Sequence, residues 1–482
     1  MPPKRDAKSP AKSRAAAAAP STALVATTKP TVAWYSTTKS ALSVFIDNYL
    51  VPVLLMTSTP TTAYIFTYIC AMPKPTITDF AALVSAKGVG AVAAEVAAEL
   101  TPTVEAATVL LVFNFVALLI YWWPGKTEYG PRTENGALPE YMDNGVAHCI
   151  LFTLCFVAGS DLCLGWYKLS VLFDCFPATI GTLNVSGLAF CLFLYFKGIY
   201  KPSGPDNGHS GYGFLFDYYW GMELYPRLWN VDVKKFVNCR FSMTYWMLAG
   251  VSFVAASYEK HGELDPGLLL CAISQFVYLF KFYVWEIGYM RSIDIIVDRA
   301  GFYETWGCIV WVPAIYTLHT RTAVNLASGL SWPAALAIFA VGLAGVGLNF
   351  QADDQRQRFR AAKDHTKVKI WGRTPQYIEA EYSSLNVATG KVEVHKSLLL
   401  ASGWWGTARH NQYLFELTAA YSWGFLAGVG THGALPLFYP VFLTILLIHR
   451  AHRDEQKCLA KYGKHYEKYM QMVPYKIVPF IY

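Results

Sequence analysis

Charged residues are scarce in this sequence. Only 15% of its 482 residues are Asp, Glu, Lys or Arg, whereas soluble domains carry about 25%. Together with 54% hydrophobic residues, this deficit excludes an ordinary soluble globular protein and indicates a membrane protein. Because apolar segments recur along almost the whole length, we expect one polytopic domain rather than several soluble domains.

Motifs for metal or Rossmann-type nucleotide binding are also missing. No Cys-x-x-Cys pair occurs among the ten cysteines, which argues against zinc and redox motifs. His449 and His452 are three residues apart, but no Cys or carboxylate set completes a metal site with them, so we expect no bound metal. The G-x-G-x-x-G match at 428–433 lies between apolar segments rather than after a strand, so it does not indicate a βαβ unit.

The N-terminal segment lacks the apolar core of a secretory signal peptide. Residues 1–31 are rich in Lys, Arg, Ala, Ser and Pro, and they offer too little apolar surface to offset the entropy of ordering. We therefore expect a disordered basic tail on the cytoplasmic side of the membrane, and no nucleic-acid partner. Residues 32–100 form a variable N-terminal membrane region in this interpretation, and the main membrane domain occupies 101–482.

About ten segments are candidate transmembrane helices, since a span needs roughly 20 apolar residues. They lie at 41–72, 104–123, 146–169, 177–196, 241–258, 266–285, 302–318, 331–350, 412–427 and 434–449. We predict an all-α polytopic membrane protein from this pattern. Several segments contain Pro, Gly or charge, which helices tolerate where they face protein or a cavity.

Two polar stretches, 197–240 and 351–396, divide these segments. Within the second, WGRTPQYIEAEY and GKVEVHK are typical of a β-hairpin. RQRFR lies at the start of this stretch, where Arg356 and Arg360 share one helical face and could grip a single phosphate. The alternative is that these arginines only anchor the topology on the cytoplasmic side.

The C-terminal 33 residues carry a second candidate site. If this region is helical, side chains three and four residues apart form one stripe, which holds Arg450, Asp454, Cys458, Lys461, Tyr462, His465 and Tyr469. A packing face rarely combines cations, a carboxylate and phenols in this way. The alternative is a juxtamembrane amphipathic helix with Lys and Tyr reaching the interface.

Carboxylates lie in or beside apolar segments. Ionisable residues at membrane depth are costly and are therefore functional candidates; here they are Glu286, Asp294, Asp298 and Glu304. The alternative is internal pairing of Asp294 or Asp298 with Arg291 or Arg299. A further segment, DYYWGMELYPR at 217–227, combines Glu223 with a dense aromatic set and suits a flat apolar ligand with one polar end.

Four motifs resemble the sterol reductase family, which includes delta-14 and delta-7 sterol reductases and the membrane domain of the lamin B receptor. They are DYYWGMELYPR, DRAGFY, LLLASGWWGTARHNQY and HRAHRDEQKCLAKYGKHYEKYMQMVPYKIVPFIY, and the similarity covers roughly 105–482. MELYPR is similar to the delta-7 group, the 7-dehydrocholesterol reductases, whereas delta-14 relatives tend to have RELNPR. The resemblance makes 101–482 a sterol reductase membrane domain.

The resemblance implies a multi-pass enzyme of the endoplasmic reticulum that reduces the C7–C8 double bond of a sterol with NADPH during sterol biosynthesis. It implies a cofactor pocket on the cytoplasmic side of the C-terminal part. The NADPH contacts that it implies are Arg356, Arg360, Leu400, Trp405, Gln412, Tyr413, Asp454, Cys458, Lys461, Tyr462 and Tyr469. Gln412 departs from the Asn or His that the family often has at this position.

The implied reaction needs a proton donor, because an isolated alkene has no carbonyl to polarise. A buried carboxyl could stay protonated, and a Tyr supported by a nearby cation could also give a proton. Our candidates for the acid or a proton relay are Tyr462 with Asp454 and Arg450, followed by Tyr303, Glu223 and Glu286. The substrate is apolar and resident in the bilayer, whereas the cofactor is polar and cytosolic, so the site must join two unlike pockets.

Other functions stay open at this point. The chain could be a sterol delta-14 reductase, or a non-enzymatic sterol-binding or scaffold protein of the membrane. A membrane methyltransferase of the isoprenylcysteine type shares part of the C-terminal pattern, but such enzymes lack MELYPR and GWWG. An association with a sterol isomerase or another enzyme of the pathway also stays open.

Overall fold

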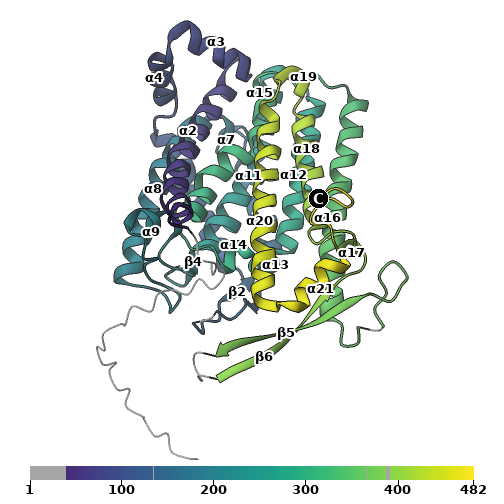
Figure 1. Cartoon of the computed structure of the whole chain (residues 1–482). Coiled ribbons are helices and arrows are strands. Elements are labelled where there is room, and N and C mark those ends of the chain that lie inside the picture. Colours follow the sequence, from purple (N-terminus) through teal and green to yellow (C-terminus); the bar gives the residue numbers. More distant parts are fainter. Residues whose placement is uncertain (1–39, 134, 366, 387–390) are drawn as a thin grey trace, which may run out of the picture.

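Long helices run side by side through the middle of the molecule (Figure 1). The computed structural model describes residues 40–482 except 134, 366 and 387–390, so the predicted tail at 1–31 lies outside the described residues. The helices of the first half are α1 (Ala41–Phe45), η1 (Ile46–Leu50), α2 (Val51–Ala71), α3 (Ile77–Lys87), α4 (Val89–Glu99), α5 (Val104–Tyr121), α6 (Gly145–Gly159), α7 (Val171–Asp174), α8 (Phe176–Tyr200), α9 (Phe214–Trp220), α10 (Val233–Lys235) and η2 (Phe236–Ser242).

The helices of the second half hold most of the candidate site. They are α11 (Met243–His261), α12 (Pro266–Val284), α13 (Glu286–Tyr289), α14 (Ile293–Ile296), η3 (Phe302–Tyr316), α15 (Leu318–Asn325), α16 (Trp332–Ala361), α17 (Trp404–Thr407), α18 (Asn411–Leu426), α19 (Val429–His432), η4 (Leu435–Leu437), α20 (Phe438–Tyr462) and α21 (Lys464–Met472). The segment η3 has π-helical geometry. This geometry is rare in proteins, and where it occurs it often lies at a functional site.

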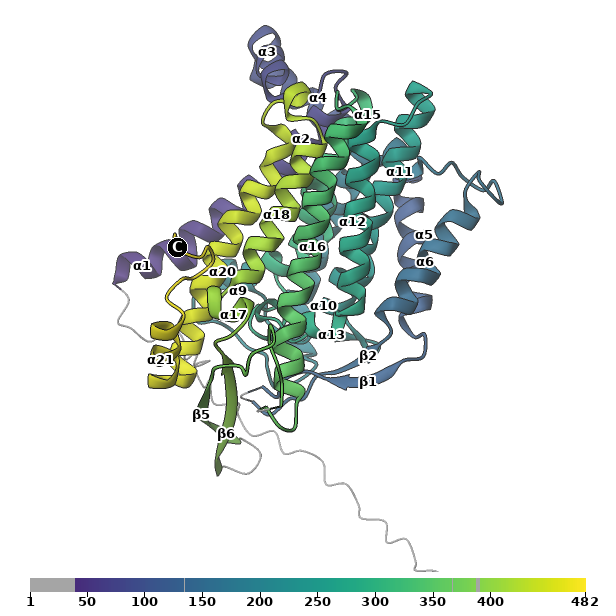
Figure 2. The same ribbon diagram turned by 90° about the vertical axis from the view of Figure 1, so that its right-hand side faces the viewer.

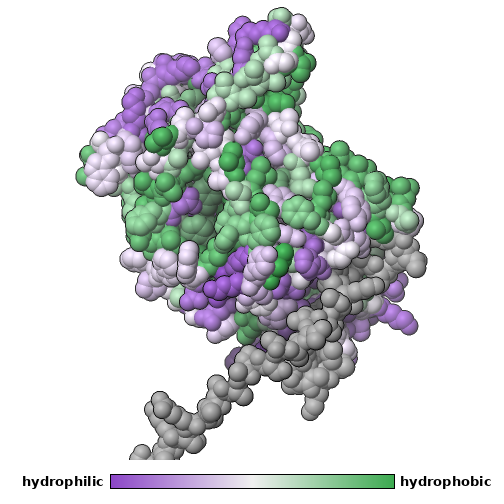
Figure 3. All heavy atoms as spheres, turned by 90° about the vertical axis from the view of Figure 1, so that its left-hand side faces the viewer, coloured by the Kyte–Doolittle hydropathy of each residue, from purple (hydrophilic) through white to green (hydrophobic). Residues whose placement is uncertain are grey.

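The chain is a mostly helical, polytopic membrane protein. Among the described residues, six helices are long and apolar enough to cross a membrane, or seven if the bent pair α3 and α4 counts as one span. The six are Ala41–Ala71, Val104–Tyr121, Phe176–Tyr200, Pro266–Val284, Trp332–Ala361 and Leu435–Tyr462. Apolar residues lie across the middle of the face in Figure 3, with hydrophilic residues toward the two ends.

Six of the ten expected spans therefore pass as membrane-crossing helices by length and composition. Four of the predicted segments form helices that are shorter or more polar, namely α6, α11, η3 and α18. Three of these helices carry side chains from the centre of the core, such as Trp246, Trp306 and Trp423, each 1% exposed. A helix that packs against protein does not need the all-round apolar surface of a helix that faces lipid.

Short antiparallel strand pairs lie at one end of the helices, opposite α3 and α15 (Figure 2). They are β1 (Lys126–Tyr129) with β2 (Glu140–Asp143), β3 (Arg227–Leu228) with β4 (Val231–Asp232), and β5 (Tyr377–Asn386) with β6 (Lys391–Leu400). The last pair confirms the predicted hairpin, with Tyr377 opposite Leu400 at its base. Leu400 therefore lies where the hairpin returns to the helices.

The C-terminal region is not one continuous helix. Gly463 has φ 49° and ψ −125°, a conformation open to glycine but strained for other residues. It ends α20 at Tyr462 and starts α21, whose Tyr466 and Tyr469 pack against β5 and β6. The prediction of a helix is therefore confirmed as far as Tyr462. Beyond Gly463, the predicted His465 and Tyr469 belong to a second helix and do not continue the stripe.

Candidate active site

A cavity of about 1230 Å³ lies among α12, η3, α16, α18 and α20. One part of its wall is apolar and aromatic, and includes Trp311, Phe442 and Leu446. Another part is cationic, and includes Arg360 and Lys461. Because a helix rises 1.5 Å per residue, Phe442 and Lys461 lie about 28 Å apart along α20. The cavity thus joins two environments of opposite polarity.

Every residue to which the resemblance assigns a cofactor contact lines this cavity. The set is Arg356, Arg360, Leu400, Trp405, Gln412, Tyr413, Asp454, Cys458, Lys461, Tyr462 and Tyr469. These residues come from α16, β6, α17, α18, α20 and α21, so the fold gathers them from segments that are far apart in the sequence. His465, by contrast, is not among the described residues that line the cavity.

The RQRFR and GWWG motifs meet at the cationic part. The Arg356 guanidinium lies 4.0 Å from the centre of the Trp405 ring, and Trp405 Nε1 donates to the carbonyl of Ala352 at 2.7 Å. A side chain at Gly403, where φ is +62°, would collide with Gln355 and Ile370. Glycine at this position therefore lets the GWWG backbone lie directly against α16.

Arg409 orders the C-terminal segment. It pairs with Glu455, with Arg409 Nε donating to Glu455 Oε1 at 2.7 Å, and its Nη1 donates to the carbonyls of Val473 and Pro474 at 2.6 and 2.8 Å. The backbone N–H groups of Arg409 and His410 donate to Tyr475 and Lys476. Arg409 thereby holds residues 473–476 against the loop that precedes α18.

His410 and Gln412 present polar atoms to the cavity. The His410 ring stacks on Tyr413 with centroids 5.2 Å apart, and burial lowers the pKa of His410 to about 3. Its Nε2 lies 4.0 Å from Asp454 Oδ2. His410 Nε2 and Gln412 Oε1 are buried without a hydrogen-bond partner in the described part of the chain. Because buried polar atoms are normally satisfied, these two atoms suit a ligand.

Two long-range ion pairs flank Tyr303. Arg450 Nη2 lies 2.8 Å from Asp294 Oδ2, and Arg453 Nη2 lies 2.5 Å from Asp298 Oδ1. All four charges act on Tyr303, which lines the cavity with them. The alternative of internal pairing thus holds for Asp294 and Asp298, but with other arginines than the local ones: Arg291 pairs with Glu128, and Arg299 donates to backbone carbonyls.

A close backbone crossing positions Tyr303. Gly221 and Gly301 lie so near each other that a Cβ on either would collide with the other's backbone, and the Ala300 N–H donates to the Glu223 carbonyl at 3.0 Å. Trp220 then stacks on the Tyr303 ring with centroids 6.1 Å apart. The DYYWGMELYPR and DRAGFY motifs meet here, so the first supports Tyr303 rather than lining the cavity itself.

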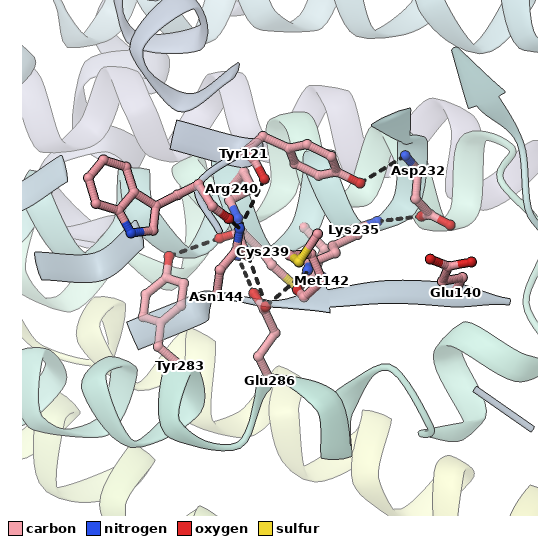
Figure 4. Close-up of polar contacts among 12 residues, drawn as sticks. Tyr121, Glu140, Met142, Asn144, Asp232, Lys235, Cys239, Arg240, Tyr283 and Glu286 are labelled. Carbon is pink, nitrogen blue, oxygen red and sulfur yellow. Dashed lines mark hydrogen bonds and ion pairs between the residues drawn. The ribbon is translucent and has the colours of Figure 1, made fainter. Parts of the chain in front are cut away.

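Glu223 and Glu286 are not brought to the cavity. Glu286 is fully buried against Arg240 and Lys235 (Figure 4), with Arg240 Nη2 donating to Glu286 Oε2 at 2.8 Å. Burial acts to raise the pKa of Glu286, but the charges of Arg240 and Lys235 prevail and lower it to about 2. Glu223 pairs with Lys197 at 2.6 Å. Both carboxylates are therefore ion-pair partners, and neither is among the described residues that line the cavity.

The remaining candidates of the α20 stripe lie toward the C-terminal end of this helix. The Tyr462 hydroxyl donates to Ser397 Oγ at 3.3 Å, and Cys458 Sγ lies 4.0 Å from Asp454 Oδ2. The Tyr469 hydroxyl donates to the Trp405 carbonyl at 3.2 Å, and burial raises the pKa of this phenol. Tyr462 is twelve residues from Arg450, or about 18 Å along the helix.

Several cavity residues were not predicted from the sequence. They are Tyr278, Lys281, Asn349, Glu416, Arg453 and Lys457. Lys281 and Glu416 could have been found, because each is a charge inside an apolar segment. In the part of the chain that the structure describes, no group of three or more His, Cys, Asp or Glu residues could hold a metal ion.

The residues present fit a phosphate-bearing dinucleotide. Arginine forks match phosphate oxygens, and Arg356 and Arg360 supply two of them beside Lys457 and Lys461. Trp405 and Tyr413 add aromatic faces, and the unpartnered atom of Gln412 can accept from a ligand amide. A cavity above the usual range of roughly 300–1,000 Å³ for one ligand leaves room for a second molecule.

Comparisons with known proteins find relatives over most of the chain. The chain matches the ergosterol biosynthesis ERG4/ERG24 family over residues 48–482. It is 39% identical to a 7-dehydrocholesterol reductase of Arabidopsis thaliana over 79% of this chain and 86% of the relative. It is 34% identical to a delta(14)-sterol reductase of Methylotuvimicrobium alcaliphilum over 76% and 80%, and 32% identical to a 7-dehydrocholesterol reductase of Danio rerio over 79% and 78%.

Proposed function

The chain belongs to the ergosterol biosynthesis ERG4/ERG24 family of sterol reductases, and on that premise we propose that it reduces the C7–C8 double bond of a sterol with NADPH. We propose the endoplasmic reticulum membrane as its location. The observation that carries the proposal is the single cavity with a cationic part and an apolar aromatic part. A polar cofactor and a membrane-resident sterol can meet only in a site of this kind.

Arg356, Arg360 and Lys461 would hold the phosphates of NADPH in this proposal, and Trp405, Gln412 and Tyr413 would orient its nicotinamide end. When bound, NADPH supplies a hydride. Arg356 is already held against Trp405 and lies 3.1 Å from Asp353, so little of its rotamer freedom is left to lose on binding. Asp454 lies between Arg450 and Lys461 on the cavity-lining face of α20.

We assign the proton to the Tyr303 hydroxyl. One carbon of the double bond takes this proton and the other takes the hydride, so the bond is reduced and water returns the proton to Tyr303. Burial, Asp298 and Asp294 act against the phenolate left behind, so Tyr303 keeps its proton until the alkene takes it, and Arg453 and Arg450 act to stabilise that phenolate. Tyr462, the first candidate from the sequence, donates instead to Ser397 on the hairpin.

The surrounding side chains exclude water from the reacting bond. Trp311 and Tyr316 lie on η3 beyond Tyr303, and Phe442 and Leu446 face the cavity from α20. The ring centroids of Trp311 and Phe442 are 5.2 Å apart. A dry aromatic wall of this kind lowers the local dielectric and favours a flat hydrocarbon.

Assignment to the C7–C8 bond rests on MELYPR, which is similar to the delta-7 group, and on the 39% identity to a relative named 7-dehydrocholesterol reductase. A relative named delta(14)-sterol reductase is 34% identical. The test therefore compares reduction of the C7–C8 bond with reduction of the delta-14 bond. Membranes with this protein and NADPH are given a delta-5,7 diene and a delta-8,14 diene side by side. We expect loss of the delta-5,7 diene absorbance, and faster loss of the delta-8,14 diene would assign the other bond.

A further inference from the structure

We propose that Tyr278, Lys281, Asn349 and Glu416, here called the Glu416 cluster, form the binding site for the sterol hydroxyl group. The inference rests on the proposed function and adds the group that fixes the position of the substrate. All four side chains line the cavity. They come from α12, α16 and α18, and none of them belongs to the residues assigned to the cofactor.

The cluster is a connected hydrogen-bond network. The Tyr278 hydroxyl donates to Glu416 Oε1, and Asn349 Nδ2 donates to Glu416 Oε2 at 3.2 Å and to the Gln412 carbonyl at 2.9 Å. Lys281 Nζ donates to Asn349 Oδ1 and lies 5.3 Å from the centre of the Tyr278 ring. Asn349 is thereby fixed in orientation, because its carbonyl and amide ends both have assigned partners.

The network leaves room for one more donor. A carboxylate offers about four acceptor positions, and Tyr278 and Asn349 take one on each oxygen of Glu416. A hydroxyl that enters the cavity can donate to a remaining position. A charged acceptor makes a stronger hydrogen bond than a neutral one, so a hydroxylated ligand gains more here than its hydrocarbon analogue.

The cluster and Tyr303 line the same cavity. Glu416 follows Gln412 by four residues, about 6 Å along α18, so it lies one turn beyond the cofactor contacts. Tyr316 feels the charges of both Tyr303 and Glu416, so both groups lie in its neighbourhood. In a 3-hydroxysterol the hydroxyl is on ring A and the C7–C8 bond is in the adjoining ring B, so the hydroxyl can meet Glu416 while the bond faces Tyr303.

The depth of the cluster also suits a sterol. Lys281 lies in the last turn of α12, and Glu416 lies in the second turn of α18, so the cluster is near the end of the membrane segments that carries the cofactor contacts. An amphipathic sterol keeps its hydroxyl at the bilayer interface. A sterol that slides in from that leaflet therefore brings its hydroxyl to the level of Glu416 without turning over.

Glu416→Ala and Glu416→Gln are tested with a 3-hydroxy delta-5,7 sterol and its 3-deoxy analogue. The wild type should have a KM about 10- to 100-fold lower for the hydroxysterol, as expected for a hydrogen bond to a charged group. Glu416→Ala should abolish this preference by raising the hydroxysterol KM, and it should leave the KM of the deoxy analogue and of NADPH unchanged. Glu416→Gln should retain part of the preference.

Tyr421→Phe is the matched control on α18, because the Tyr421 hydroxyl contacts Thr444 at 3.2 Å. Equilibrium binding of both labelled sterols to purified protein is measured in the same samples. If Glu416→Ala weakens both sterols equally, the cluster only pins three helices together and the proposal is wrong. If it weakens neither, the hydroxyl binds elsewhere. A wild type that binds the sterols without reducing either would reject the reductase function, while the binding difference would still test the cluster.

Discussion

Tyr303 is the residue on which the chemistry depends in this account. It lies on the cavity wall between an apolar part and two arginines that are held by Asp294 and Asp298. Its position depends on a glycine pair, Gly221 and Gly301, that no side chain can replace without moving the backbone. A single phenol placed in this way can serve as the acid without a metal ligand set.

Replacing Tyr303 by Phe should lower kcat by about 100-fold or more, the usual contribution of a positioned acid. Sterol and NADPH binding should change little, because the ring and its stacking on Trp220 remain. Turnover and equilibrium binding are measured on purified protein. Tyr212→Phe, at a tyrosine that is 38% exposed, serves as the control, and a kcat near the wild-type value in Tyr303→Phe would remove this residue from the chemistry.

Arg356 and Arg360 can be tested against the arginine between them. Replacing both with Ala should raise the KM for NADPH about tenfold or more, since each removes a charged contact, and it should affect sterol binding less. Arg358→Ala is the matched control, because Arg358 is 78% exposed and pairs with Asp354 at 2.7 Å. An NADPH dependence that stays unchanged in the double variant would mean that RQRFR only anchors the topology.

At the scale of elements, the ion network around Glu286 holds α6, η2 and α13 together. Asn144, which precedes α6, accepts a hydrogen bond from Arg240 Nη2 at 2.7 Å, and Lys235 lies 3.3 Å from Glu286. The side chains of Arg240 and Glu286 are 0% exposed. Because removal of one partner leaves buried charges without compensation, such networks are costly to break.

Glu286→Ala should therefore destabilise the protein by about 3–5 kcal/mol, which is measured as a lower midpoint of thermal unfolding in detergent. Arg291→Ala is the comparison, because its pair with Glu128 is 48% and 24% exposed and should contribute about 0–1 kcal/mol. The sign for acid follows from the pKa of Glu286. Since this pKa is lowered, its stabilising effect is present above the ordinary pKa and is lost as the pH falls toward 2.

What could be predicted from the sequence at this scale depended on local pattern. The β5–β6 hairpin and the α20 stripe were predictable, because alternation and helical spacing are properties of neighbouring residues. The break at Gly463 was missed, although a glycine before a polar segment can end a helix. The pair of Arg453 with Asp298, 155 residues apart, could not be found, because only the packing of α20 beside η3 brings its members together.

For the candidate site too, local sequence motifs were predictable and long-range packing was not. The presence of Trp405 and Tyr469 in one site was predictable, since both lie in long motifs that resemble a known family. The choice among the candidate acids could not be made from the sequence, because Glu223, Glu286 and Tyr303 are all polar residues in or beside apolar segments. Burial with Arg240 and Lys197 separates the two carboxylates from the cavity, and that information is three-dimensional.

At the scale of the whole molecule, the helices form a bundle with strand pairs at one end and α3 and α15 at the other (Figure 2). The cavity opens among the helices of the second half, and the β5–β6 hairpin reaches it through Leu400 and contacts Tyr462. Helices that line it present apolar residues at one depth and cations at another. In the proposed function, this arrangement lets a water-soluble reductant meet a lipid-soluble substrate.

Transfer of isotope from NADPH to a sterol tests this central claim most directly. Purified protein is given a delta-5,7 diene and NADPH that carries deuterium at the transferable position. The account predicts a product with one deuterium from the cofactor on one carbon of the former C7–C8 bond, and one solvent hydrogen on the other carbon. A folded protein that binds both ligands but returns a sterol without cofactor deuterium would contradict it.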